Sequence, residues 1–163
     1  MQKIISICIP TYNGAKTIGK TLDSIIQNTR SINDASKKLE IVLTDDCSTD
    51  DTYSVIKKYA NKYDFLKTSR NEKNLGMDVN FHRAAMNSSG SFIWFSGQDD
   101  VFLEGSISHI LGIIKKYPKI GLIDVNYSQY SEELSRNVCD SMFHRQAYEP
   151  YKIDFNHDLL FKN

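Results

Sequence analysis

The sequence predicts an α/β protein of three layers, in which a mainly parallel β-sheet lies between helices. Short apolar runs alternate along the chain with longer segments whose apolar residues recur every three or four positions. That alternation is typical of parallel sheets with helical crossovers. The predicted strands are apolar throughout rather than alternately polar, which is expected where helices cover both faces of the sheet.

Strands and helices are expected in strict alternation. The strands are predicted from apolar runs bounded by turn residues, at 3–9, 39–43, 65–69, 92–95 and 120–127. The helices are predicted from apolar residues on one helical face, at 15–29, after Ser48 to 63, at 76–88 and at 103–117. Ser48 and Asp51 have the spacing of a capping box, and residues 31–38 are expected to form a polar loop.

The alternating pattern covers residues 1–127, whereas residues 128–163 are polar and lack a clear period. A chain of 163 residues is long enough for one domain with a core. We therefore expect one α/β domain in residues 1–127 and the start of a further, incomplete region in residues 128–163. The final segment, HDLLFKN, has no terminal signal, so a chain truncated at its C-terminus is expected.

Composition excludes several classes of protein. Twenty basic and twenty acidic residues give a net charge of zero, which argues against a general nucleic-acid binder. No apolar stretch has the length of a membrane span, and Pro10 interrupts the N-terminal run too early for a signal peptide. Cys8, Cys47 and Cys139 lack disulfide or zinc spacing, which fits a reducing compartment. A cytoplasmic location is expected.

Three polar clusters follow predicted strands: TYN after the first, DDCS after the second and GQDD after the fourth. The carboxyl ends of parallel strands share one rim, where such sheets bind ligands. Each cluster also has a structural interpretation, as a turn or as carboxylates that precede a helix. Their convergence nevertheless favours a binding site.

The rim would carry four carboxylates, those of Asp45, Asp46, Asp99 and Asp100. Such a group requires a cation or hydrogen-bond donors, and oxygen ligands suit Mg²⁺ or Mn²⁺. Neither G-x-G-x-x-G after the first strand nor a P-loop is present, so ordinary dinucleotide folds and P-loop enzymes are excluded. A carboxylate-held cation is another way to neutralise phosphates.

Three blocks of the sequence resemble the inverting family-2 glycosyltransferases, which have the A-type glycosyltransferase fold. The blocks are SICIPTYNGAKTIGKTLDSI, EIVLTDDCSTDDT and NLGMDVNFHRAAMNSSGSFIWFSGQDD. They occur in the family's order and spacing, and the resemblance covers roughly residues 3–127. It implies that residues 1–127 bind a nucleoside-diphosphate sugar, the donor, and that residues 128–163 begin the acceptor side.

The resemblance also implies roles for individual residues. The family's P-x-Y-N stretch lines the pocket of the nucleotide base, and its second Asp after the second strand receives an N–H of the base. An N-x-G segment belongs to the nucleotide-binding residues, the helix after it carries an arginine that would face the diphosphate, and the final acidic pair contacts the ribose and the metal. These roles fall on Pro10, Thr11, Tyr12, Asn13 and Asp46, on Asn74 and Arg83, on Asp99 for ribose or metal, and on Asp100 for metal.

The sequence departs from the family's pattern in two ways. Gly97 and Gln98 stand where many relatives have an acidic residue. The catalytic base, a carboxylate in the C-terminal half of family members, cannot be assigned here, because Glu149, Asp154 and Asp158 lack the expected context.

The resemblance implies that the enzyme transfers a sugar, with inversion, to a hydroxyl of a glycan or lipid-linked acceptor. A UDP-sugar is the leading candidate for the donor. Bacterial surface polysaccharide synthesis is the implied setting, with Mn²⁺ or Mg²⁺ as cofactor. The alternative is a nucleotide-sugar binding module without transfer activity, and a nucleotidyltransferase is disfavoured because TYNGAKTIGK lacks a glycine- and arginine-rich loop. Lysine pairs at 37–38, 57–58 and 115–116 leave peripheral association with the inner membrane face open.

Overall fold

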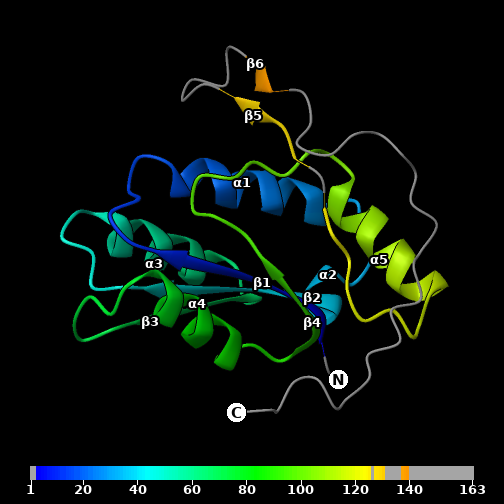
Figure 1. Cartoon of the computed structure of the whole chain (residues 1–163), viewed down its shortest axis with the longest axis horizontal. Coiled ribbons are helices and arrows are strands. Elements are labelled where there is room, and N and C mark those ends of the chain that lie inside the picture. Colours follow the sequence, from blue (N-terminus) through cyan, green and yellow to red (C-terminus); the bar gives the residue numbers. More distant parts are fainter. Residues whose placement is uncertain (1–2, 126, 131–136, 140–163) are drawn as a thin grey trace, which may run out of the picture. The chain divides into compact units, whose positions relative to one another are not determined.

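The computed structural model describes residues 3–125, 127–130 and 137–139 (Figure 1). The chain separates into two compact units, Met1–Lys119 and Ile120–Asn163. The first unit holds a four-stranded sheet and its helices, and the second holds a two-stranded ladder. The functional division at residue 127 stays a prediction, since most of residues 128–163 lie outside the described residues.

The sheet of the first unit is parallel throughout, with the strand order β3-β2-β1-β4. Its strands are β1 (Lys3–Thr11), β2 (Leu39–Asp45), β3 (Leu66–Arg70) and β4 (Gly90–Phe95). The pairing of β1 with β2 continues to Thr11 and Asp45, but its pairing with β4 ends at Cys8 and Phe95. The carboxyl ends of β1 and β4 therefore separate. The polar clusters that follow the strands lie at this same edge of the sheet.

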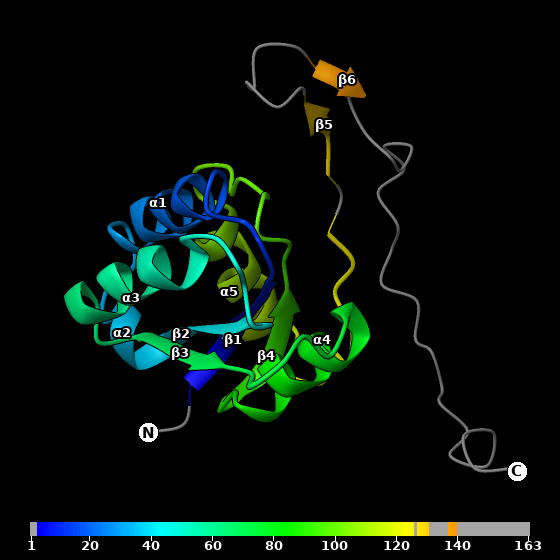
Figure 2. The same cartoon turned by 90° about the vertical axis from the view of Figure 1, so that its left-hand side faces the viewer.

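Helices cover both faces of this sheet, as predicted. Figure 2 shows α4 (Met77–Met86) on one face, and α1 (Ile18–Thr29), α3 (Thr52–Lys62) and α5 (Ser106–Lys116) on the other. A single helical turn, α2 (Ala35–Lys38), lies within the segment that was expected to be a loop. The three-layer α/β/α prediction is confirmed.

The core follows the predicted period on α1 and the continuous apolar character of β1 and β2. The apolar residues predicted to face inward on α1 are all buried: Ile18, Leu22, Ile25 and Ile26. Every residue of β2 is buried, because β1 and β3 flank it and helices cover both its faces. The central strand next to the site is therefore fully enclosed by the rest of the first unit.

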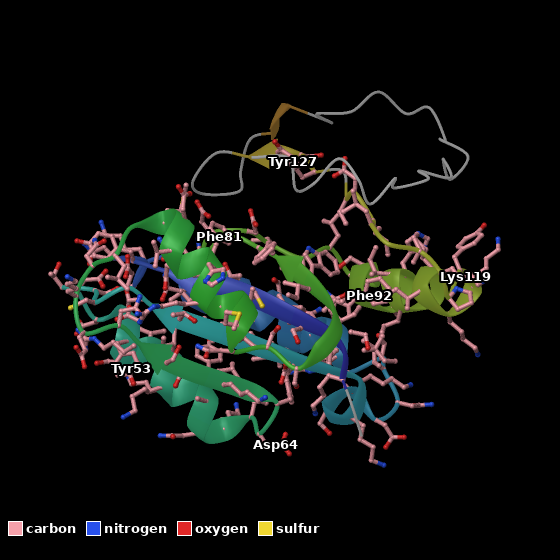
Figure 3. All side chains as sticks on the ribbon, turned by 60° about the horizontal axis from the view of Figure 1, so that its bottom comes forward. Tyr53, Asp64, Phe81, Phe92, Lys119 and Tyr127 are labelled. Carbon is pink, nitrogen blue, oxygen red and sulfur yellow. The ribbon has the colours of Figure 1, made fainter. Side chains whose placement is uncertain are left out.

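The prediction that every strand is covered on both faces is wrong for β4. Burial alternates along this strand, and Ile93 and Phe95 are 43% and 50% exposed. The Phe95 ring forms a T-shaped pair with that of Phe81 from α4, with ring centroids 5.4 Å apart, and Figure 3 shows Phe81 projecting from that helix. Among the described residues, β4 is an edge strand with β1 as its one neighbour.

Residues 120–127 were predicted to form a fifth strand, and that prediction is wrong for the residues that the structure describes. Residues 120–125 and 127 form no strand; the second unit instead contains β5 (Gln129–Tyr130) paired antiparallel with β6 (Asn137–Cys139). An apolar run supplies side chains suited to a strand but says nothing of a hydrogen-bonding neighbour. Only the presence of a neighbour creates a ladder.

A buried carboxylate organises the amino end of the sheet, away from the rim. Glu40 of β2 is fully buried, and its Oε1 accepts hydrogen bonds from the Ser6 hydroxyl (2.7 Å) and from the Ser89 amide and hydroxyl (2.5 and 2.9 Å). The Lys67 ammonium lies 2.7 Å from Oε2. Burial alone would raise the pKa of Glu40, but the hydrogen bonds from Lys67, Ser6 and Ser89 outweigh it and lower the pKa to about 2.

Candidate functional site

The polar clusters that follow the strands converge on one rim of the sheet, as predicted. Four segments meet there: residues 12–15 after β1, 46–51 after β2, 71–76 after β3 and 96–100 after β4. Hydrogen bonds join the first segment to the second and fourth, and the second to the third. The rim is therefore one connected structure rather than four independent turns.

The loop after β1 is fixed by side chains from other segments. Four successive backbone amides each donate to a side-chain oxygen: Tyr12 to Gln98 (3.0 Å), Asn13 to Ser48 (3.0 Å), Gly14 to Thr52 (2.7 Å) and Ala15 to Asp50 (3.1 Å). Asn13 has a left-handed backbone with φ of 50°, and its Oδ1 accepts the Thr49 amide (2.9 Å). The exposed side chain of Tyr12 consequently projects from a preorganised loop.

Asp45 is fully buried and already has its partners. Its carboxylate accepts hydrogen bonds from the amide and hydroxyl of Ser48, and Arg70 Nε lies 3.2 Å from Oδ2. Arg70 also donates to the Ser48 carbonyl (2.9 Å) and lies over the Tyr53 ring. This carboxylate therefore braces the turn after β2 and is not available to a ligand.

The predicted capping box of Ser48 and Asp51 is wrong. The Ser48 hydroxyl is engaged by Asp45 and Asn13, and α3 begins at Thr52 without a side-chain cap from Asp51. Asp50 takes that place, because its Oδ1 accepts the amide (3.0 Å) and the hydroxyl of Thr52. Burial works to raise the pKa of Asp50, but these bonds from Thr52 and the amide of Ala15 lower it overall.

Asp46 is also buried, at 2% exposure, and it holds the loop after β3. Its Oδ1 accepts from Asn71 Nδ2 (2.7 Å) and the Leu75 amide (2.9 Å), and its Oδ2 accepts from the amides of Leu75 (3.1 Å) and Gly76 (2.9 Å). The exposed Asn74 closes the same turn by accepting the Gly76 amide (2.9 Å). Three donors therefore share the two oxygens of Asp46.

A chain of amide side chains leads from Asp46 to Arg83. Asn71 Nδ2 donates to Asp46 and to Asn80 Oδ1 (3.1 Å), while Asn71 Oδ1 accepts from Arg83 Nη1 (2.8 Å). Asn80 Nδ2 donates to the Thr44 carbonyl (2.8 Å), which ties α4 to the end of β2. The exposed Arg83 guanidinium is thus held at the rim by one of its five N–H groups, and the others can reach an anion.

Asp99 and Asp100 after β4 are both exposed. Asp100 Oδ2 accepts the Gly97 amide (2.6 Å) and the Ser96 hydroxyl (3.2 Å), which leaves Oδ1 without a described donor. Asp99 makes no hydrogen bond or ion pair within residues 3–125. A Cβ at Gly97 would lie 2.8 Å from Asp99 Oδ1 and 3.2 Å from Asp100 Oδ2, so a residue without a side chain here gives both carboxylates room.

The remaining sequence-predicted residues lie at or just below the rim. Thr11 is buried and its hydroxyl donates to the Thr44 carbonyl (3.4 Å), whereas Pro10 pairs with Thr44 within the sheet. Six of the predicted residues are exposed at the rim: Tyr12, Asn13, Asn74, Arg83, Asp99 and Asp100. Thr11 and Asp46 lie beneath them.

The contacts that Asn71 and Gln98 make at the rim were not predicted from the sequence. Asn71 was assigned to a loop, although its place directly after the third strand puts it at the same rim as the other clusters. Gln98 was noted as a missing acidic residue, whereas its side chain contacts the loop after β1. No sequence signal announces the Gln98 contact, because its partner is backbone.

A divalent cation fits this rim only if the ligand supplies part of its coordination. No group of three or more His, Cys, Asp or Glu side chains converges anywhere in the part of the chain that the structure describes. Asp99 and Asp100 offer one free carboxylate and one free carboxylate oxygen. Mg²⁺ and similar ions are held in proteins by one or two carboxylates together with phosphate oxygens and water, which matches this donor set.

Residues 6–161 match the family model described as glycosyl transferase family 2. The chain belongs to this family. As a family-2 glycosyltransferase sequence, it is 34% identical over 122 residues to abequosyltransferase RfbV of Salmonella typhimurium, covering 74% of this chain and 35% of RfbV. It is 32% identical over 146 residues to the poly(ribitol-phosphate) β-N-acetylglucosaminyltransferase TarS of Staphylococcus aureus, covering 88% of this chain and 24% of TarS.

Solved structures agree with this assignment. The crystal structure of S. aureus TarS 1–349 in complex with UDP-GlcNAc matches with a TM-score of 0.64 at 27% identity, over 74% of this chain and 37% of that one. The mannosyltransferase PcManGT from Pyrobaculum calidifontis, solved with GDP-Man and Mn²⁺, matches with a TM-score of 0.60 at 22% identity, over 70% of this chain and 33% of that one, which shows the fold alone. The predicted A-type glycosyltransferase fold is confirmed.

The chain spans about a quarter to a third of the length of the curated relatives described here, 24% of TarS and 35% of RfbV. None of the helices in the described residues is both long enough and apolar enough to cross a membrane.

Proposed function

We propose that this chain forms the donor-binding part of an inverting glycosyltransferase. The donor is a nucleoside-diphosphate sugar, with UDP the leading nucleotide, and the acceptor is a hydroxyl of a glycan or lipid-linked molecule in bacterial surface polysaccharide synthesis. Membership of glycosyl transferase family 2 supports the reaction class. The relatives named for transfer of abequose and of N-acetylglucosamine, and the TarS structures with UDP and UDP-GlcNAc, support the donor class.

The observation that carries the proposal is the free carboxylate of Asp99 at a rim whose other components are fixed.

The base of the nucleotide would lie against Tyr12 and Asn13, above Pro10 and Thr11. Both side chains are exposed on a loop whose backbone amides are all engaged. A loop fixed in advance binds a ligand at a smaller entropic cost than a mobile one.

Asp46 retains capacity for the base N–H. Each of its oxygens accepts two hydrogen bonds, because the Leu75 amide is shared between both. The N–H of the base would be received at the oxygen that the Leu75 amide releases when it donates to the other oxygen alone. Asn74 and the loop that Asp46 holds would then border the pocket.

Arg83 and the cation would bind the two sides of the diphosphate. Arg83 is presented by Asn71 and keeps N–H groups for phosphate oxygens. Asp99 and Oδ1 of Asp100 would hold Mn²⁺ or Mg²⁺. When bound, that cation neutralises the charge that develops on the departing nucleoside diphosphate.

Neither the acceptor site nor the catalytic base is assigned to the residues that the structure describes. Glu149, Asp154 and Asp158 lie outside the described residues, so no catalytic residue is proposed. We place the reaction in the cytoplasm at the inner membrane face, where the lysine pairs at 37–38, 57–58 and 115–116 would meet anionic lipid.

Calorimetric titration tests this proposal. UDP, dTDP and GDP are each titrated into the chain with and without Mn²⁺, and one of them should bind in a metal-dependent manner. Asp99→Asn should lose about tenfold or more of the affinity measured with Mn²⁺, since it removes the free charge. The control is Asp64→Asn, at an exposed carboxylate labelled in Figure 3 in the connection between α3 and β3. The proposal fails if no nucleotide binds to a folded sample.

A further inference from the structure

Gln98 joins the loop after β4 to the loop after β1. Its Oε1 accepts the Tyr12 amide (3.0 Å) and its Nε2 donates to the Tyr12 carbonyl (3.1 Å). One side-chain amide thus pairs with both backbone groups of one residue, as a neighbouring strand would. The contact is reciprocal, so it fixes both the distance and the orientation between the two loops.

This side chain fills the gap that opens where β1 and β4 separate. Their ladder ends at Cys8 and Phe95, followed by one more bond from the Ser96 amide to the Cys8 carbonyl (3.1 Å). Beyond that point β1 continues along β2 and leaves β4 without a partner. The Gln98 amide therefore replaces the ladder bonds that the diverging backbones cannot make.

The backbone of Gln98 is anchored as well. Its carbonyl accepts the hydroxyl of Thr21, a fully buried residue of α1 (2.9 Å). With the main chain tied to α1 and the side chain tied to Tyr12, residue 98 has little freedom. Asp99 and Asp100 follow it directly, so their position relative to Tyr12 and Asn13 depends on this anchor.

Gly14 provides the space that Gln98 occupies. A Cβ at position 14 would lie 2.2 Å from Oε1 and 2.4 Å from Cδ of Gln98, far inside van der Waals contact. The contact also requires an amide rather than an acid. An ionised Glu or Asp cannot donate to the Tyr12 carbonyl and would place negative charge against it.

We propose that Gln98 is a positioning residue that holds the cation-binding carboxylates in register with the base-binding loop. The two ends of the donor are then bound as one unit, and Mn²⁺ at Asp99 and Asp100 strengthens nucleotide binding because the loops keep a fixed separation. This inference rests on the proposed donor-binding function. It gives the residue that departs from the family's acidic pattern a role of its own.

The test measures how far Mn²⁺ improves nucleotide affinity in each variant. In Gln98→Ala and Gln98→Glu, this improvement should fall about tenfold, in addition to any affinity without metal that is lost because the Tyr12 loop is less well fixed. Gln27→Ala, which removes an exposed glutamine of α1, should behave as wild type. Hydrogen exchange at the Tyr12 amide gives a second readout that needs no ligand, and it should accelerate in Gln98→Ala, which lacks the acceptor, but not in Gln27→Ala.

The outcomes separate this inference from the proposed function. Wild-type chain that binds no nucleotide overturns both. Metal-dependent binding that Gln98→Ala and Gln98→Glu leave unchanged overturns the inference alone, even if Tyr12 exchange accelerates, because the contact would then be only structural. Gly14→Ala serves if a Gln98 variant fails to fold: it keeps the amide but displaces it, and it should reproduce the loss of metal-dependent improvement.

Discussion

Two aspartate pairs follow parallel strands of the same sheet, and their surroundings are opposite. Asp45 and Asp46 after β2 are buried, and each has its charge met by Arg70 or by backbone and amide N–H groups. Asp99 and Asp100 after β4 are exposed, and Asp99 has no partner within the described residues. The same dipeptide therefore builds the rim in one place and presents a charge to ligands in the other.

The position of each strand explains the difference. β2 lies inside the sheet, so the segments after β1 and β3 reach its carboxyl end from both sides and supply donors. In the described part of the chain β4 has β1 alone beside it, and the one loop that reaches its end meets Gln98 rather than the carboxylates. A carboxylate becomes available to a cation where the fold supplies too few donors to satisfy it.

The largest expected effect on stability is that of Asp46→Asn. The new NH₂ group would face an amide N–H of the loop 71–76, so a buried donor loses its acceptor and the charge that three donors share is lost. The free energy of unfolding should fall by about 3 kcal/mol. Urea unfolding measures it, with Asp64→Asn as the exposed control. Equal unfolding midpoints for Asp46→Asn and wild type would show that the Asp46 carboxylate does not stabilise the fold.

Acid sensitivity should report the buried carboxylate of Glu40. The pKa of Glu40 is about 2 in the folded chain and 4.5 ordinarily, so its contribution is complete above pH 4.5 and is lost as the pH falls from 4.5 towards 2. This pKa difference corresponds to about 3 kcal/mol in the free energy of unfolding. Unfolding by urea at several pH values should give a steeper decline for wild type than for Glu40→Gln in this window. Parallel curves would contradict the prediction.

The smallest expected effect on stability is that of Asp99→Asn, within about 0.5 kcal/mol of wild type, because its carboxylate has no partner to lose. Thermal unfolding in the presence of Mn²⁺ and the bound nucleotide should nevertheless distinguish the two proteins. Wild type should gain stability from the ligands by mass action, and Asp99→Asn should gain much less. A large loss of stability without ligand would mean that Asp99, like Asp46, serves the fold.

The sequence predicts the succession of strands and helices along the chain, because it follows from apolar periodicity. It also predicts that the polar clusters converge, because the carboxyl ends of parallel strands share one rim. It does not distinguish the satisfied aspartates from the free one. Ser48 lies three positions from Asp45, but Arg70 and Gly76, which meet Asp45 and Asp46, lie well over twenty positions away, and only the fold brings them close. The strand predicted at 120–127 and the capping box failed for the same reason: each depended on a neighbour that the local pattern does not reveal.

The packing of the Gln98 side chain against Gly14 has a consequence for how this sequence can vary through evolution. Residues 14 and 98 occupy one volume, so neither can be exchanged freely while the other stays the same. Homologues in which position 14 carries a side chain should carry a shorter residue at position 98, and those with glutamine at 98 should keep glycine at 14. The two positions should covary across an alignment even though neither is acidic.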